Sequence, residues 1–290
     1  MKPMIPVRAW WRALSIPSIL VMSLAAEVRA TSLYDSLGNF VWGAAAQFEI
    51  LTLGSSSDGG LNLSAPSGSA GYEVTGNVGI AGTSSSLSIS GSADILGNVY
   101  LNTGDSVSKT GSSTINGSIY YNQKTLLNSA ASSALNISTL ADQASQTYHW
   151  STEDLNLGTG KMVTLQSTGH FVMDIDDFVL GGGGSGKTGA ILTLSGSSNS
   201  TFIFNISGDF LVGGGAKILL TGGITASDVI FNLVGCTSYG SVTGDALVNG
   251  TILATNGSVT LSGHDTQVNG QIIAGKVCIQ SGADADCMSP

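Results

Sequence analysis

The sequence predicts an all-β chain that forms a three-faced β-helix, a solenoid of short stacked strands, with one long α-helix packed along one side. Two observations favour this fold over a β-sandwich. One five-residue phrase recurs at a period near 20 residues, and the composition is typical of many short β-segments joined by small polar turns. Glycine supplies 40 of the 290 residues, and the chain is 42% hydrophobic but only 10% charged.

The N-terminal 30 residues have the three parts of a secretory signal peptide. Lys2, Arg8 and Arg12 are basic, residues 13–26 are apolar, and the segment ends in a Val-Arg-Ala site at 28–30. We therefore expect residues 1–30 to be removed on export and residues 31–290 to form a single β-helix domain. The apolar part is too short for a spanning helix, which needs about 20 apolar residues, so no membrane insertion is expected after signal cleavage.

The repeated phrase has an aliphatic residue at each end and a glycine near its centre. It occurs at 74–78, 95–99 and 115–119, and again at 248–252 and 268–272. At ~3.3 Å per residue, about 20 residues make one coil of three short strands. One coil cannot bury its apolar side, so coils stack around a shared interior. The phrase predicts these repeated core positions: Val78, Val99, Ile119, Ile252 and Ile272.

Two features of this repeat give geometric expectations. Ile252 and Ile272 should stack one rung apart, about 4.8 Å, and Gly250 and Gly270 should turn the corners between strands. A longer pair of segments, 191–206 and 218–233, repeats at an offset of 27 residues and adds to the evidence for a repeated fold.

Residues 126–148 break the β pattern. Apolar residues recur there at spacings of three and four, which predicts one narrow stripe on a helix of about six turns. The stripe consists of Leu126, Ala130, Ala134, Ile137, Ala141, Ala144 and Tyr148. Its small alanines permit close approach to a flat surface, so we expect the helix to lie lengthwise along the solenoid.

Residues 181–188 read G-G-G-G-S-G-K-T and match the loop that cradles nucleotide phosphates in nucleotide-binding enzymes. Such a loop leads into the N-terminus of a helix, whose N–H groups hold the phosphates. Here the residues after Thr188 are β-formers that end in a glycine turn. We therefore predict a turn between two strands, with no nucleotide cofactor.

No other motif marks an enzyme. Asp174, Asp176 and Asp177 cluster, and two of them could hold Ca²⁺, but we interpret them as a solvated strand edge. His149, His170 and His264 are scattered and read as ordinary surface or boundary residues. We predict a protein that is not an enzyme, with no catalytic residues, no cofactor and no metal site.

The charge pattern excludes some partners. From Thr31 onward the chain has six lysines, no arginine and eighteen carboxylates, a formal charge of −12. Such a chain cannot neutralise a run of phosphates, so we expect no binding to nucleic acid. It is equally unsuited to docking on anionic lipid.

Export permits a disulfide, and Cys278 and Cys287 are the nearest pair in sequence. Three free or buried thiols are the alternative, and the partner of Cys236 stays open. Residues 276–290 are interpreted as a C-terminal tail. No sorting or lipidation motif is visible in this tail.

Residues 43–54, the alanine-striped helix, and residues 192–233 and 248–275 resemble the secreted β-helix superfamily of microbial ice-binding-like proteins. They resemble even more closely its bacterial surface and adhesin-type relatives, often called choice-of-anchor A proteins. The resemblance implies a right-handed β-helix in which N-terminal and C-terminal coils stack out of sequence order. It also implies a flat face rich in Thr, Ser and Ala that carries the binding.

The chain departs from the ice-binding members in one phrase. Residues 76–82 read G-N-V-G-I-A-G, where those members commonly have G-D-[IL]-G-V-S-P, and no ladder of T-x-T triplets follows the coil period. We therefore expect a secreted, extracellular or cell-surface protein that presents a flat face to an extended ligand, such as a matrix polymer or the cell envelope. Ice binding is the alternative function, and a carbohydrate-active enzyme is a third.

Overall fold

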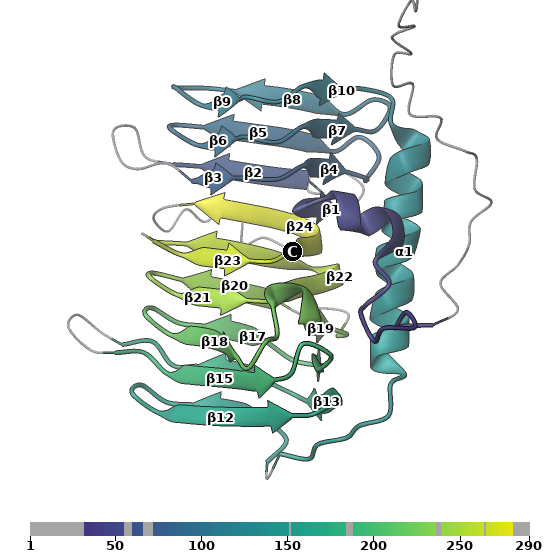
Figure 1. The fold of residues 1–290 in the computed structure, drawn as a ribbon. Coiled ribbons are helices and arrows are strands. Elements are labelled where there is room, and N and C mark those ends of the chain that lie inside the picture. The colour runs from purple at the N-terminus through teal and green to yellow at the C-terminus, as the bar shows by residue number, and fades with distance from the viewer. Residues whose placement is uncertain are drawn as a thin grey trace, which may run out of the picture.

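A computed structural model of the chain describes residues 32–54, 60–65, 72–150, 152–183, 188–235, 239–263 and 265–280. Within these ranges the strands pair in parallel along three faces of one stacked solenoid, and one long helix runs along its side (Figure 1). The predicted three-faced β-helix with one helix is confirmed. None of the helices in the described ranges is long and apolar enough to cross a membrane.

The face that packs against helix α1 (Lys124–Asp142) is named the helix face. Two of its strands, β22 and β24, continue around a corner onto the next face, and their mutual register shifts between Ala254 and Ser258. From one end of the solenoid to the other, the strands are β10 (Ile119–Tyr120), β7 (Val99–Leu101), β4 (Val78–Ile80), β1 (Ile50–Thr52), β24 (Ile272–Gln280), β22 (Thr251–Ser262), β19 (Val229–Leu233), β16 (Thr201–Ile206) and β13 (His170–Ile175).

The face onto which β22 and β24 continue is named the third face. In the same direction its strands are β8 (Ser106–Lys109), β5 (Ser86–Ser90), β2 (Gly60–Ser64), the second halves of β24 and β22, β20 (Tyr239–Thr243), β17 (Phe210–Val212), β14 (Phe178–Leu180) and β11 (Leu155–Leu157).

The remaining face consists of two separate sheets. The smaller sheet has β9 (Thr114–Ile115), β6 (Asp94–Ile95) and β3 (Glu73–Val74). The larger has β23 (Gln267–Asn269), β21 (Leu247–Asn249), β18 (Lys217–Thr221), β15 (Ile191–Gly196) and β12 (Met162–Ser167). Two 3-10 turns, η1 (Gly43–Gln47) and η2 (Ala226–Asp228), lie outside the sheets.

The coils do not stack in sequence order. Strand β1 pairs with β24 on one side and with β4 on the other, so the N-terminal coils sit on the C-terminal strand (Figure 1). The first coils run to one end of the solenoid, helix α1 returns along its length, and the remaining coils climb back to the middle. This order agrees with what the resemblance implied.

The predicted repeat-core positions share one column of the helix face. Ile252 pairs with Ile272 and Val78 with Val99, and Ile50 stands between the two groups, paired with Ile272 and Val78. All of these are at most 4% exposed. Ile119 ends the column on the terminal coil and is half-buried, because no strand of the described residues pairs with β10 on its outer side.

Glycine is required at the corners for two different reasons. Gly250 has a φ of +149°, which a residue with a side chain rarely adopts, and a Cβ there would lie 2.8 Å from the ring of Phe231. Gly97 lies outside that region of φ, yet its Cβ would lie 2.1 Å from the carbonyl oxygen of Gly76 in the next coil. The glycines therefore permit rung spacing that a methyl group would prevent.

Helix α1 ends at Asp142, six residues before the predicted end at 148. The N–H of Ala144 bonds the carbonyl of Ala141 in a tightened last turn, and the N–H groups of Thr147 and Tyr148 then reach Val172 O on β13. The strand edge thus takes donors that a longer helix would have kept. The ring of Tyr148 still packs against an apolar residue, since its centroid lies 4.9 Å from that of the Phe171 ring.

The predicted C-terminal tail at 276–290 is partly wrong. Residues 276–280 form the second half of β24 and pair with β2 and β22. Alternating residues Val277 and Ile279 fill the core, which binds this segment into the solenoid. Residues 281–290 lie outside the described ranges, as does the predicted signal peptide.

Candidate binding face

The outward side of the sheet β12-β15-β18-β21-β23 is the candidate binding face and is named the flat face. Its inward residues, such as Leu192, Leu194 and Ile218, are fully buried and fix the strands on the core. No register shift interrupts the pairing of β12, β15 and β18. Outward side chains on this rigid support therefore repeat at the rung spacing of ~4.8 Å.

The outward side chains form three columns across the strands. The first contains Met162, Ile191, Lys217, Leu247 and Gln267. The second contains Thr164, Thr193 and Leu219, followed by Asn249 and Asn269, and the third contains Gln166, Ser195 and Thr221. All are exposed or half-buried, and Met162 is 72% exposed. The face offers hydroxyl and amide groups beside aliphatic ones.

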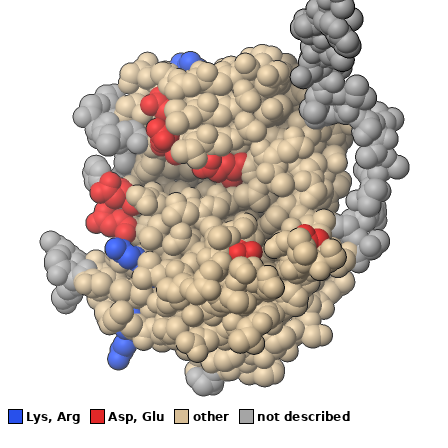
Figure 2. Space-filling view, viewed as in Figure 1, with Lys and Arg blue, Asp and Glu red and all other residues tan. Residues whose placement is uncertain are grey.

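The flat face carries almost no charge. Lys217 is the only charged residue in the three columns. Figure 2 shows the same view as Figure 1: uncharged surface covers most of its lower half, and charged atoms lie mainly along its left margin and in its upper half. A face of this kind suits a neutral, extended ligand more than an ionic one.

The other two faces differ from the flat face in access. Helix α1 covers the helix face, where Ala130, Ala134 and Ile137 pack against the sheet. The third face is open on β5 and β8, but Thr260 and Cys278 point outward from its middle strands and are only 4% and 2% exposed. The flat face is therefore the face whose outward columns are accessible along the whole sheet.

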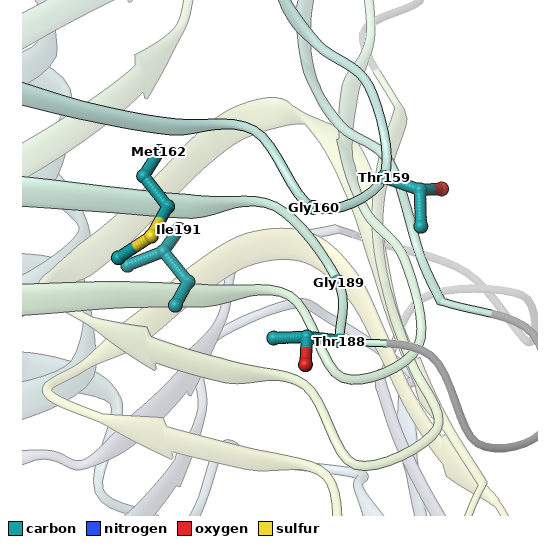
Figure 3. Close-up of a pocket in the computed structure, with 6 residues that line it drawn as sticks. All are labelled: Thr159, Gly160, Met162, Thr188, Gly189 and Ile191. Carbon is teal, nitrogen blue, oxygen red and sulfur yellow. The ribbon is translucent and has the colours of Figure 1, made fainter.

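A shallow notch continues the flat face at its edge. It has a volume of about 610 Å³ and lies where the turn before β12 approaches the segment before β15. Figure 3 shows Met162 and Ile191 side by side and Thr188 on the adjoining loop. None of the described residues that line it is charged, so this part of the notch continues the neutral face. Its lining residues are Thr159, Gly160, Met162, Thr188, Gly189 and Ile191.

The glycine-rich loop joins two strands, as predicted. β14 ends at Leu180, and β15 begins at Ile191, so a strand follows Thr188 where a phosphate-binding loop would lead into a helix. Residues 184–187 lie outside the described ranges. The absence of nucleotide binding stays a prediction.

The aspartates at 174–177 take part in local hydrogen bonds. Asp174 accepts from the side-chain amide of Asn205 at 2.9 Å, and Asp176 accepts from the Ser207 hydroxyl at 2.9 Å. Asp177 accepts from the backbone N–H of Asp209 at 2.7 Å. Across the part of the chain that the structure describes, no group of three His, Cys, Asp or Glu side chains could hold a metal ion.

The histidines are not brought together. His170 stacks on Tyr34 with ring centroids 3.8 Å apart, and its Nδ1 lies 2.8 Å from the Thr201 hydroxyl. His149 is exposed, and His264 lies outside the described ranges. Burial raises the pKa of Tyr34, whose ring stacks on His170.

Cys278 is disulfide-bonded. Cys236 and Cys287 both lie outside the described ranges, so the pairing of Cys278 with Cys287 stays a prediction.

Sequence reasoning did not find the residues of the flat face. The alternation of aliphatic and polar residues in 191–196 and 217–221 marks outward positions, but it does not tell which of three faces is left open. That depends on where the helix packs.

Comparisons with known proteins identify a family and a shared fold. A family model described as "Putative Ice-binding-like adhesive domain" matches residues 34–284. No curated protein matches the chain.

Solved structures share the fold. A glycosylated ice-binding protein from an Arctic yeast is 17% identical with a TM-score of 0.50, over 85% of this chain and 92% of that one. An ice-binding protein from an Antarctic Flavobacteriaceae bacterium is 19% identical with a TM-score of 0.50, over 83% of this chain and 45% of that one. A third, from an Antarctic biological consortium, is 15% identical with a TM-score of 0.50, over 86% and 90%. At such identities the likeness shows the fold alone.

Proposed function

Since the chain belongs to the family of ice-binding-like adhesive domains, we propose that it is a non-catalytic binding protein that attaches to an extended surface through its flat face. The ligand is a neutral matrix polymer or a neutral part of the cell envelope. The observation that carries this proposal is the set of in-register outward columns, which hold hydroxyl, amide and aliphatic groups and a single charge.

Such a face binds through many weak contacts made at once. Each hydrogen bond to a ligand is worth only about 1 kcal/mol in water, so one rung alone would bind poorly. The strands are already fixed by the core, so little side-chain or backbone freedom is lost on binding. Because many such contacts form together on a rigid support, their small binding free energies add up to a useful affinity for a ligand that is itself repetitive.

Ice binding is the second candidate function. It is favoured by the solved neighbours described as ice-binding proteins and by Thr164 and Thr193, which stand one rung apart on the flat face. Against it, each column mixes side chains of different size, from Thr193 to Leu219 and Asn249. A crystal lattice requires like groups at like spacing, whereas a flexible polymer can adapt to such a mixture.

The binding site would operate outside the cytoplasm. Residues 1–30 have the pattern of an export signal, and the disulfide at Cys278 suits an oxidising compartment. Residues 31–290 would then be the mature domain.

Adsorption to insoluble polymers tests the main proposal. We expect saturable binding to at least one of cellulose, chitin and peptidoglycan, measured by depletion of the protein from solution. Thr193→Arg places a large cation at the centre of the flat face and should weaken adsorption about tenfold or more, a loss of about 1.4 kcal/mol. Ser88→Arg, at an outward position on β5 of the third face, is the matched control and should bind as the unchanged protein does.

Freezing assays separate ice from polymer. The proposal predicts plain disc-shaped ice growth and no thermal hysteresis at high protein concentration. Shaped crystals that Thr193→Arg abolishes would make ice the ligand instead. Adsorption that Ser88→Arg weakens as much as Thr193→Arg does would show that the flat face is not the site.

A further inference from the structure

Four asparagines of the chain are followed directly by glycine: Asn116, Asn249, Asn256 and Asn269. Asparagine is one of the chemically labile residue types of proteins. Its loss begins when the backbone nitrogen of the next residue attacks the side-chain amide carbon, and a glycine at that position has no Cβ to obstruct the approach. The fold therefore decides which of the four side chains is free to react.

Asn249 and Asn269 are held by hydrogen bonds. They stand on neighbouring rungs of the flat face, and the Asn269 amide donates to Asn249 Oδ1 at 2.9 Å. The Asn249 amide donates to Ile218 O at 2.7 Å. The N–H of Gly250, which is the attacking group for Asn249, itself donates to Asn269 O at 2.9 Å. Bonds of this kind must break before either side chain can react.

Asn256 lies inside the stack of coils. It belongs to β22, in which Ser258 pairs with both β20 and β24, and Ala254 on the other side of Asn256 pairs with Ala274. The Asn256 side chain is exposed. The paired residues on both sides of it restrict the backbone rotation that ring closure requires, so we expect slow reaction at this position.

Asn116 has none of these restraints. It lies on the terminal coil, which consists of β8, β9 and β10, and no strand of the described residues pairs with β9 on its outer side. Its side chain is exposed and makes no hydrogen bond to any described residue. The equivalent position of the neighbouring coil is Leu96, whose side chain offers no hydrogen bond. The N–H of Gly117 donates to no backbone oxygen of the described residues.

We propose that Asn116 is a site of spontaneous deamidation, through which the exported protein acquires a carboxylate on its terminal coil as it ages. The Gly117 nitrogen gives up its proton and forms a bond to Cγ of Asn116. The Cγ–Nδ2 bond breaks, and the nitrogen leaves with that proton as ammonia. Water then opens the resulting succinimide at either of its carbonyl groups. The products are aspartate and isoaspartate, in which the chain continues through the side-chain carbon.

The two products affect the terminal coil differently. Aspartate adds a charge at an uncovered edge, and such a charge opposes the addition of another chain's strand. Isoaspartate also adds one carbon to the backbone before Gly117. A Cβ on Gly117 would already overlap the carbonyl oxygen of Gly97 in the neighbouring coil, so this corner has no room for another carbon. Isoaspartate therefore loosens the terminal coil.

Ageing of the full exported protein (residues 31–290) at mildly alkaline pH tests the assignment. Digestion and mass spectrometry follow the conversion of amide to acid at every Asn-Gly pair in one sample. Asn116 should convert at least about tenfold faster than Asn249 and Asn269. Its rate should rise with pH, because the attacking nitrogen must lose its proton. The test does not depend on the ligand of the flat face.

Free peptides are the matched control, because they have the same Asn-Gly bonds without the fold. The probes are T-I-N-G-S-I-Y (114–120), A-L-V-N-G-T-I (246–252) and T-Q-V-N-G-Q-I (266–272). All three should convert at similar rates, so that the differences within the folded protein come from the structure.

Two variants separate charge from backbone change. Asn116→Gln has a longer side chain that closes a ring less readily, and it should form no acidic fraction at this site while the unchanged protein does. Asn116→Asp carries the charge alone and should have the thermal midpoint of fresh protein. The isoaspartate fraction, identified by an isoaspartate-specific methyltransferase, should unfold at a lower temperature.

Three results would contradict the proposal. Equal conversion of Asn116 and Asn269 in the folded protein would show that the hydrogen bonds protect nothing and would overturn the assignment. An unchanged Asn116 in a sample whose free peptide has converted would overturn it as well. Equal thermal midpoints of the isoaspartate fraction and fresh protein would overturn the effect on the terminal coil.

Discussion

Thr52 on β1 places a hydroxyl where the core provides no partner for it. The residue is fully buried, and its Oγ1 has no hydrogen-bond partner within the described residues. Its neighbours in the column are Ile80 and Ala274, both apolar. An unsatisfied buried hydroxyl costs free energy of folding, because water solvates it in the unfolded chain.

Thr52→Val should therefore raise the free energy of unfolding by about 1 kcal/mol, since it replaces the hydroxyl by a methyl group of similar shape. Urea denaturation measures the difference. Thr201→Val is the control and should destabilise, because the Thr201 hydroxyl lies 2.8 Å from His170 Nδ1. Destabilisation by both variants would mean that Thr52 has a partner after all.

Asp105 gives the stability a pH dependence of defined sign. Its carboxylate accepts from the N–H groups of Ser85 at 3.0 Å and Asn102 at 2.8 Å, but burial outweighs these bonds and raises the pKa of the carboxyl. The folded protein then holds this proton to higher pH than the unfolded chain does. The contribution of Asp105 is fully present below its unfolded pKa and is lost as pH rises through the folded pKa.

Asp105→Asn removes this titration. The difference in unfolding free energy between the unchanged protein and the variant should therefore decrease as the pH rises from about 4 to about 7. Urea titrations at several pH values give the slope. A difference that grows with pH would contradict the raised pKa.

At the scale of the element, helix α1 is held on the solenoid by two kinds of contact. Its alanine stripe packs on aliphatic residues of the helix face such as Leu253 and Ile273. Nearer its C-terminal end, Asn232 on β19 donates to Ser138 O at 3.0 Å and accepts from the Ser138 hydroxyl at 2.7 Å. Asn205 on β16 donates to Ala141 O at 2.8 Å. The alanine stripe alone would allow the helix to shift along its axis. The hydrogen bonds from the buried Asn205 and Asn232 side chains form at only one axial position of the helix.

Asn232→Ala should lower the unfolding free energy by about 2–3 kcal/mol, because it leaves the Ser138 carbonyl and the Asn205 amide oxygen without their buried donor. Asn128→Ala, on the exposed side of the same helix, should change it by less than about 0.5 kcal/mol. Thermal denaturation of both variants measures this. Equal, small effects would show that the alanine stripe suffices to position the helix.

At the scale of the whole molecule, the terminal coil is an uncovered edge. Its inward residues Val107, Ile115 and Ile119 are only partly buried, and no strand in the described structure pairs with β8, β9 or β10 on their outer side. Lys109 stands in a core column there, paired with the fully buried Ile89. A lysine at an inward edge position opposes the addition of another chain's strand.

Lys109→Ile should therefore promote end-to-end association. We expect oligomers that grow with concentration in sedimentation velocity, because the variant completes an apolar column at an unpaired edge. Ser108→Ile adds the same side chain at the adjacent outward position, and this variant should have the same oligomeric state as the unchanged protein. Oligomers in both variants would indicate general stickiness instead of edge pairing.

The sequence alone determined the coil. Each phrase places an aliphatic residue inside and small polar residues outside, and each corner glycine permits close stacking, so Val78 and Ile252 could be assigned to the core without any knowledge of their neighbours. The helix was also predictable from its stripe, though not its end, since the strand edge at Val172 takes its last donors. These features depend only on residues that lie close together in the sequence, so the sequence alone reveals them.

Only the tertiary structure decided which coils meet. Ile272 could stack on any coil with the same column, and it stacks on Ile50, which belongs to no repeated phrase. At that junction no strand of the described residues lies between β3 and β23, and the packing of α1 on one side leaves the flat face open. Such choices depend on contacts between residues more than 200 positions apart, and a repeated sequence gives every coil the same local signal, so it cannot rank one junction above another.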